Sequence, residues 1–331
     1  MDIRTISVVA LSNADYPSLS AKLAEASRWM TVAAGDGADL VVLPECLNTY
    51  YGDGFGSRQP PPVTEHAFDD WRQETSLLIE TAQRENLWVV IPVIHRDDRG
   101  LWNSFFLVSP QGEAVWRYDK VSPTDGELDA GILPGRASFY DWRGVRLGGA
   151  ICFDTCFPEN LNRWAAENVQ LGLVPSLWPG GSQLNHFCKI HASRVALSYP
   201  AWSRIIDVDG LEAAEGGYRN ETLRFGFGVP VYTASLNFDR LTLYGAKNQD
   251  KMTDLVEKYG KRVRVVYDQG NCLWFLESRD PALNESDLQQ EYGLITASEY
   301  FTAYSQNLHR FRQAAESADG NPSGPSTRKG L

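Results

Sequence analysis

Apolar runs alternate with amphipathic segments along the first part of this chain, and this rhythm constrains the fold more than any other feature. Strands are expected at residues 5–11 (TISVVAL), 39–44 (DLVVLP) and 87–94 (LWVVIPVI). Between them, residues 17–34 and 71–86 place apolar side chains at helical spacing. Strands that are apolar throughout are typical of a sheet covered by helices. The pattern therefore predicts a layered α/β fold.

Hairpins interrupt this rhythm in the middle of the chain. Residues 104–108 and 114–118 flank the turn SPQGE, and residues 139–142 and 145–151 flank a second turn. The rhythm then returns, with helices expected at 159–168 and 183–197 and strands at 171–175 and 201–208. Hairpins combined with βαβ units indicate mixed sheets.

The pattern is weaker beyond residue 241. Residues 262–275 allow one or two strands, and residues 298–313 read as a helix. A Gly/Ser/Pro-rich tail follows and is expected to be disordered. We therefore expect a main domain over residues 1–280, a helical extension over 281–315 and a disordered tail over 316–331. The stretch 241–280 could cover a site or form an oligomer contact.

Charge and cysteine content narrow the class of protein. The 331 residues include 31 Lys and Arg against 42 Asp and Glu, a net charge of −11. Nucleic acid and anionic membranes would repel such a chain, so neither is expected as a partner. No apolar run reaches the roughly 20 residues of a membrane helix, and the N-terminus lacks a signal-peptide pattern. Five cysteines without a CxxC pair suit reduced thiols, which predicts a cytoplasmic protein.

Three reactive side chains stand at or just after predicted strand ends, where layered α/β proteins commonly build their sites. They are Glu45, Lys120 and Cys152. A thiol with a pKa of about 8.5 is only a few per cent thiolate at pH 7, so a Cys nucleophile needs a base or a cation. Glu45 could take the proton of Cys152. Lys120 and the backbone N–H of Phe153 could stabilise the oxyanion formed on attack at a carbonyl or nitrile carbon, without metal or cofactor.

Other readings of these residues stay open at this point. A Cys after a strand is often an apolar filler, and Glu45 and Lys120 could be surface charges. Cys156 competes with Cys152 as the nucleophile. His186 or His191 could activate Cys152 in a Cys–His scheme, and with Cys188 they suggest metal ligands, although only Cys188 and His191 would share a helix face. We expect no metal site.

The motifs around these residues resemble the nitrilase or carbon–nitrogen hydrolase superfamily over roughly residues 4–208. The resemblance is carried, in order, by DLVVLPE, WNSFFLVSPQGEAVWRYDK and GGAICFDTCFPE. It implies a four-layer α-β-β-α sandwich. It also implies a triad with Glu45 as general base, Lys120 as electrostatic stabiliser and Cys152 as nucleophile. The second glutamate of many members maps to Glu127, which could instead be an ordinary loop carboxylate.

The chain departs from the family pattern at several positions. Cys156 stands where several members have Arg, and Ser122 replaces a His that often follows the Lys. After Arg194, Leu197 and Ser198 replace the usual acid and amide. These departures make a substrate assignment by analogy unsafe.

The expected function is hydrolysis of a small linear amide or N-carbamoyl compound through a thioester, without a cofactor. Nitrile hydrolysis, acyl transfer on the same triad and a non-catalytic binding protein are the alternatives. Tyr51, Phe153 and Trp178 are candidate substrate-binding residues. The resemblance also implies a homodimer or a larger homo-oligomer.

Overall fold

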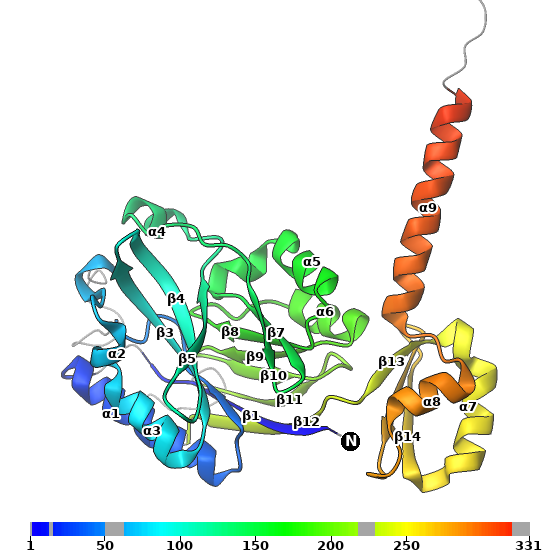
Figure 1. The fold of residues 1–331 in the computed structure, drawn as a ribbon, viewed down its shortest axis with the longest axis horizontal. Helices are drawn as coiled ribbons and strands as arrows, with labels where there is room; N and C mark the ends of the chain where they lie inside the picture. The colour runs from blue at the N-terminus through cyan, green and yellow to red at the C-terminus, as the bar shows by residue number, and fades with distance from the viewer. Residues whose placement is uncertain (1, 13–15, 50–62, 218–228, 320–331) are drawn as a thin grey trace, which may run out of the picture.

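Two six-stranded sheets form the centre of the molecule (Figure 1). The computed structural model describes residues 2–12, 16–49, 63–217 and 229–319. The first sheet has the strand order β12-β1-β2-β3-β4-β5, and the second has the order β11-β10-β9-β8-β7-β6. Both sheets mix parallel and antiparallel pairs, as the hairpins in the sequence predict.

The first sheet carries its helices on one face. Its strands are β1 (Ile3–Val9), β2 (Leu40–Val42), β3 (Trp88–Asp97), β4 (Gly100–Val108), β5 (Ala114–Asp119) and β12 (Val231–Asn237). Its helices are α1 (Leu19–Gly35), α2 (Trp71–Glu74) and α3 (Ser76–Glu85), after the short turn η1 (Val63–His66). The single helix expected at 71–86 is thus divided at Thr75, whose hydroxyl donates to the Trp71 carbonyl at 2.7 Å.

The second sheet is arranged in the same way. Its strands are β6 (Phe139–Trp142), β7 (Val145–Gly149), β8 (Leu171–Pro175), β9 (Arg194–Ser198), β10 (Ser203–Ile206) and β11 (Glu212–Gly216). The helices α5 (Pro158–Ala166) and α6 (Gln183–His191) pack on its outer face. The short elements α4 (Asp125–Asp129) and η2 (Cys152–Cys156) lie between strands.

Three hydrophobic clusters separate four layers. One lies between α1, α3 and the first sheet and contains Met30, Val41 and Leu78. A second contains Val8 and Leu173 and fills the space between the sheets. The third, around Trp164, joins the second sheet to α5 and α6. The structure therefore confirms the predicted four-layer α-β-β-α sandwich.

The helix expected over residues 183–197 is too long. Helix α6 ends at His191, and Ala192 takes a φ of +51°, which terminates the helical hydrogen bonding. The next residues form β9, which pairs in parallel with β8 from Leu171 to Pro175. All five β9 residues are buried, and this sheet pairing overrides the helical spacing that the sequence displays.

A smaller α/β module follows the sandwich. It has a three-stranded sheet, ordered β13-β15-β14, and its own hydrophobic cluster around Leu243, Leu276 and Leu288. Its elements are β13 (Leu241–Tyr244), α7 (Gly245–Tyr259), η4 (Gly260–Arg262), β14 (Val263–Asp268), β15 (Leu273–Ser278) and α8 (Glu285–Tyr292). The cluster joins residues on both sides of position 280, so we propose a domain division near residue 240 instead.

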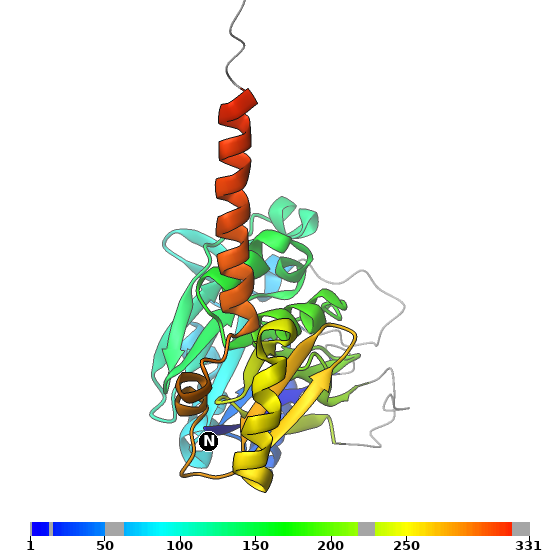
Figure 2. The ribbon, with the colours of Figure 1, turned by 90° about the vertical axis from the view of Figure 1, so that its right-hand side faces the viewer.

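The last described element is the long helix α9 (Ala297–Asp319), which projects away from the rest of the chain (Figure 2). It includes the helix expected at 298–313 and continues past residue 316, where the tail was expected to begin. Residues 320–331 of that tail lie outside the described residues.

Candidate active site

Glu45, Lys120 and Glu127 come together in one buried cluster. Lys120 Nζ lies 2.9 Å from Glu45 Oε1 and 2.8 Å from Glu127 Oε2. Glu45 follows the end of β2, and Lys120 follows the end of β5. The side chains of Lys120 and Glu45 are only 1% and 3% exposed. Pairing of opposite charges offsets part of the cost of burying them.

Asn103 completes this cluster, although the sequence did not single it out. From β4, its Nδ2 atom donates to Glu45 Oε1 at 2.8 Å and to Glu127 Oε1 at 2.6 Å. Asn103 thus fixes both carboxylates relative to each other. The sequence feature that could have indicated Asn103 is its position as the one amide side chain in the mostly apolar run WNSFFLV.

Glu127 lies on α4 and is not an ordinary loop carboxylate. It forms a capping box in which Thr124 Oγ1 accepts from the Glu127 N–H at 3.3 Å and Glu127 Oε2 accepts from the Thr124 N–H at 2.8 Å. The same Oε2 atom accepts from Lys120. One carboxylate therefore caps a helix and holds the buried ammonium.

Cys152 sits at a sharp bend between β7 and η2, with a φ of +49°. Residues other than glycine rarely adopt this left-handed conformation, and it persists only where contacts with neighbouring residues stabilise it. Buried Asp154 does so by accepting from the Ile151 N–H at 2.9 Å, the Tyr118 hydroxyl at 2.9 Å and the Ser122 N–H at 2.6 Å. The bend is thereby joined to the segment that carries Lys120.

The electrostatics of the cluster favour a neutral thiol beside a charged lysine. Burial raises the pKa of Cys152, and the negative charge of Glu45 and a hydrogen bond to it raise it further. Burial alone would lower the pKa of Lys120, but the charges of Glu45 and Glu127 and a hydrogen bond to Glu127 outweigh burial and raise it. Burial opposes the charge of Glu127 too, yet Lys120 lowers the pKa of Glu127 below its ordinary value. The resting thiol therefore has carboxylate and ammonium neighbours.

A third segment, which follows β8 of the second sheet, also contacts the cluster. The Leu177 N–H donates to Glu45 Oε2 at 2.9 Å, so both oxygens of Glu45 are engaged. Phe153 and Trp178, the candidate substrate-binding residues, are 36% and 48% exposed beside this segment and Cys152. Tyr51 lies outside the described residues.

The competing residues lie in different surroundings. Cys156 is exposed at the end of η2, whereas Cys152 is buried against Glu45 and Lys120. His191 stacks on Phe187, with ring centroids 4.7 Å apart, and lines a groove on the outer side of α6. Within the part of the chain that the structure describes, no group of three or more His, Cys, Asp or Glu residues could hold a metal ion.

A buried lysine supports the turn that carries Glu45. Lys22, on α1, is fully buried, and its Nζ donates to the Thr49 carbonyl. The Thr49 N–H and hydroxyl both donate to the Cys46 carbonyl at 2.9 Å. Burial lowers the pKa of Lys22 to about 7. A charged residue in the buried stripe of a helix was visible in the sequence, but its partner four residues after Glu45 was not.

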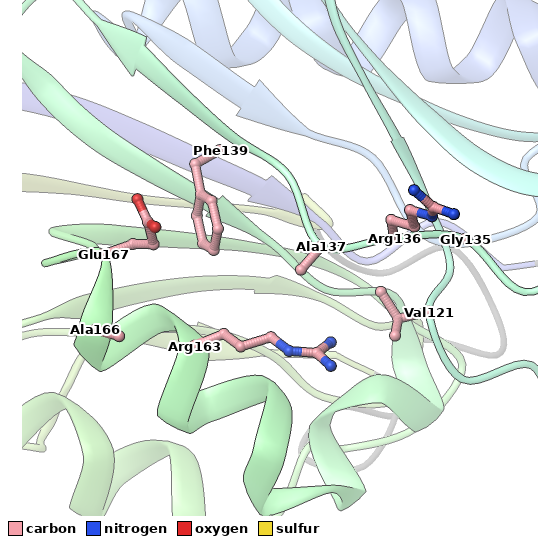
Figure 3. A pocket seen from close by; sticks show the side chains of 8 residues that line it. All are labelled: Val121, Gly135, Arg136, Ala137, Phe139, Arg163, Ala166 and Glu167. Carbon is pink, nitrogen blue, oxygen red and sulfur yellow. The ribbon is translucent and has the colours of Figure 1, made fainter.

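A separate groove lies behind the Lys120 segment (Figure 3). It has a volume of about 420 Å³ and includes Val121, Arg136 and Arg163 in its wall. Val121 follows Lys120 directly, but Glu45, Glu127 and Cys152 are not in this wall. The groove is therefore distinct from the Cys152 site.

Known proteins resemble the chain in sequence and fold. The zebrafish (Danio rerio) omega-amidase NIT2 is 30% identical over 163 residues, covering 46% of this chain and 56% of that protein. The 2-oxoglutaramate amidase of Bacillus subtilis is 25% identical, covering 56% of this chain and 77% of the other. The matched segments span about half the length of several of these curated relatives.

A solved structure and a family model extend the comparison. An amidase from Nesterenkonia sp. shares the fold, with a TM-score of 0.57 and 20% identity over 77% of this chain and 96% of that chain. None of the described helices is long and apolar enough to cross a bilayer. The carbon–nitrogen hydrolase family model matches residues 5–198, which is more than half of the sequence. The chain therefore belongs to the carbon–nitrogen hydrolase family.

Proposed function

We propose that this protein hydrolyses a non-peptide C–N bond in a small linear amide or N-carbamoyl compound, with Cys152 as the nucleophile. The observation that carries the proposal is the buried Glu45–Lys120 pair beside the Cys152 thiol. The three side chains come from separate segments, and each matches a chemical role that attack on a carbonyl requires. The reaction needs no cofactor.

In the first half of the reaction, the Cys152 sulfur attacks the carbonyl carbon while its proton passes to Glu45. The carbonyl oxygen takes up negative charge, which the Lys120 ammonium and the Phe153 N–H stabilise. Collapse of the tetrahedral intermediate breaks the C–N bond. The nitrogen leaves as ammonia or an amine with the proton that Glu45 returns, and a thioester remains on Cys152.

In the second half, water attacks the thioester. Glu45 accepts a proton from the water, the C–S bond breaks, and the thiol recovers that proton as the acid is released. Glu127 and Asn103 are positioning residues in this scheme, because they act through Lys120 and Glu45.

The side chains near Cys152 favour a neutral acyl group. Phe153, Phe157, Leu177 and Trp178 are apolar and each at least 36% exposed, and the rings of Phe153 and Phe157 meet edge to face at 5.1 Å. Burial of alkyl groups against such side chains is favourable. The structure of a variant of the Nesterenkonia amidase has been solved in complex with butyramide. We therefore expect short neutral amides such as butyramide to react faster than amides that carry a carboxylate.

The test is ammonia release from a panel of neutral amides, dicarboxylic monoamides, carbamoyl amino acids and nitriles. The proposal expects release from at least one amide or carbamoyl compound, its loss in Cys152→Ala and its retention in Cys156→Ala. Release from nitriles alone, or turnover only with an added acceptor, would favour nitrile hydrolysis or acyl transfer. No release and no adduct on Cys152 would favour a binding protein.

We also propose that the chain works as a homodimer or a larger homo-oligomer of identical subunits. The exposed helix α9 supports this proposal.

A further inference from the structure

Helix α9 stands free of the molecule for most of its length (Figures 1 and 2). Its start is anchored, because Ala297 is fully buried and the rings of Tyr300 and Tyr244 stack with centroids 3.8 Å apart. Residues 301–315 are then all exposed. The 23 residues of α9 correspond to about 34 Å of helix. Most of the stability of helices in proteins comes from packing of an amphipathic face, so a surface that covers α9 is expected.

One face of α9 carries a continuous apolar stripe. The stripe consists of Phe301, Tyr304, Leu308, Phe311 and Ala315, which follow one another at alternating intervals of three and four residues. This spacing is the heptad pattern by which helices pair along a common seam. Phe301, Tyr304, Leu308 and Phe311 are 37%, 54%, 36% and 75% exposed, so the stripe is open for contact.

The opposite face of α9 is polar. Gln306, Arg310 and Gln313 lie there, about half a turn from the stripe at 100° per residue. A helix that exposed its apolar residues by accident would scatter them around its axis. The segregation of the two faces is instead typical of a helix that buries one side against a partner.

A groove adjoins the stripe where α9 leaves the body. It has a volume of about 350 Å³ and lies between the start of α9 and helices α5 and α6. Phe301 belongs to both the stripe and the groove wall, which also includes Ala165, Ile190 and His191. The other α9 residues in the groove wall are Ser298, Thr302, Ser305 and Gln306, so the polar face of the helix is turned toward the body and the stripe beyond Phe301 points away from it.

We propose that the α9 stripe pairs with the same stripe of a second copy of this chain, in antiparallel orientation. In a pair centred near residue 306, Phe301 of one copy lies opposite Phe311 of the other, and Tyr304 lies opposite Leu308. All four large apolar residues are then matched in a single register. This contact is isologous, because both copies use the same surface and are related by a twofold axis. The pair therefore leaves no α9 stripe free to bind a further copy.

Three features favour a second copy over an unrelated partner: the matched register of the stripe residues, the apolar area that the stripe exposes, and the net charge of the chain. The stripe side chains expose roughly 400 Å² per copy, or about 800 Å² for the pair, if a full aromatic side chain offers about 200 Å². Stable interfaces bury about 1,200–2,000 Å², so the stripe supplies a large part of this area and the flanking α9 side chains must supply the rest. Arg310 and Arg312 near the free end would lie against the body of a partner whose net charge is −11.

The test is sedimentation velocity of the full chain across a range of concentrations. We expect an assembly of two or more 37.0 kDa chains. Leu308→Glu and Phe311→Glu should reduce its order, with at least about tenfold weaker association, because each places a charge in the apolar seam. Gln313→Glu adds the same charge on the polar face and should leave the assembly unchanged.

A wild-type monomer at every concentration would overturn the proposal. An assembly that survives both stripe variants, or that Gln313→Glu disrupts equally, would overturn it too. Circular dichroism of each variant separates a lost contact from a lost fold, because the stripe lies outside the clusters that hold the body together.

Disulfide crosslinking tests the orientation. A mixture of Tyr304→Cys and Leu308→Cys chains should form crosslinked dimers on mild oxidation, whereas each variant alone should crosslink no more than the unmodified chain. Efficient crosslinking of Tyr304→Cys or Leu308→Cys alone would indicate a parallel pair and refute the antiparallel register.

Discussion

Replacing Glu127 by Gln removes one of the two carboxylates that hold Lys120. The Glu127 carboxylate accepts from Lys120 Nζ and Thr124 N–H at 2.8 Å each through Oε2, and from Asn103 Nδ2 at 2.6 Å through Oε1. A glutamine offers one acceptor oxygen and one NH₂ group at the same places. The NH₂ group must therefore face a donor, either Lys120 or Asn103.

The cost follows from burial and charge. The Lys120 side chain is 1% exposed and that of Glu127 10%, so water is poorly placed to replace the lost contact. A hydrogen bond to a charged group contributes about 1.5–3 kcal/mol. Lys120 would then pair with Glu45 alone, so its ammonium group is held by one carboxylate where it was held by two. If that free energy is lost in the transition state, kcat falls roughly 10- to 100-fold, while KM changes little because Glu127 does not contact substrate in our scheme.

Ammonia release from the best amide of the panel measures this effect. Asp125→Asn is the matched control, because Asp125 is exposed on the same short helix and loses the same charge. Asp125→Asn should stay within about twofold of wild type, since exposed charges contribute little. Equal kcat values for the two variants would show that Glu127 is only a helix cap and would refute the argument.

Three further predictions concern the support of the site. Burial lowers the pKa of Lys22 from 10.5 to about 7, so the unfolded chain binds more protons than the folded one between these values. The free energy of unfolding from urea titrations should therefore rise from pH 7 to about 8.5, before thiols ionise, by up to about 1.4 kcal/mol per pH unit, and Lys22→Met should remove that slope. A flat wild-type profile would contradict the burial of a titrating amine. A Cβ on Gly149 would lie 2.4 Å from the Tyr118 ring, so Gly149→Ala should destabilise by about 1–3 kcal/mol in thermal unfolding. Gly126→Ala meets nothing within 4 Å and should not destabilise. Asn103→Leu should lower kcat at least about tenfold, because it removes the donor that both carboxylates share; unchanged kcat would assign that role to Lys120 alone.

The sandwich could be predicted because most of its strands and helices have the apolar runs or the helical spacing of apolar residues that are typical of these elements. Continuous apolar runs such as residues 39–44 read correctly as strands under helices, and the hairpins indicated mixed sheets. The segment that became β9 was misread, because its five buried residues take their conformation from pairing with β8 and not from their own spacing. The proposed boundary near residue 240 rests on a similar long-range contact, since α8 packs into a cluster that includes residues of β13 and β15.

The meeting of the candidate site residues could be predicted from their positions at strand ends and from the family motifs, whereas their catalytic roles stay a proposal. Glu45, Lys120 and Glu127 do meet, and Cys152 lies beside Glu45 and Lys120. Their supports were not predictable, because each acts across the fold. Asn103 matters only through two carboxylates far away in sequence, and Lys22 only through a carbonyl of the Glu45 turn.

The most direct test of the central claim is the position of the acyl group during turnover. The wild-type chain is mixed with a substrate amide, quenched in acid and analysed by intact mass and peptide mapping. The account predicts an acyl adduct on the peptide that carries Cys152, retained in Cys156→Ala and absent in Cys152→Ala. An adduct on Cys156, or ammonia release that continues in Cys152→Ala, would contradict it.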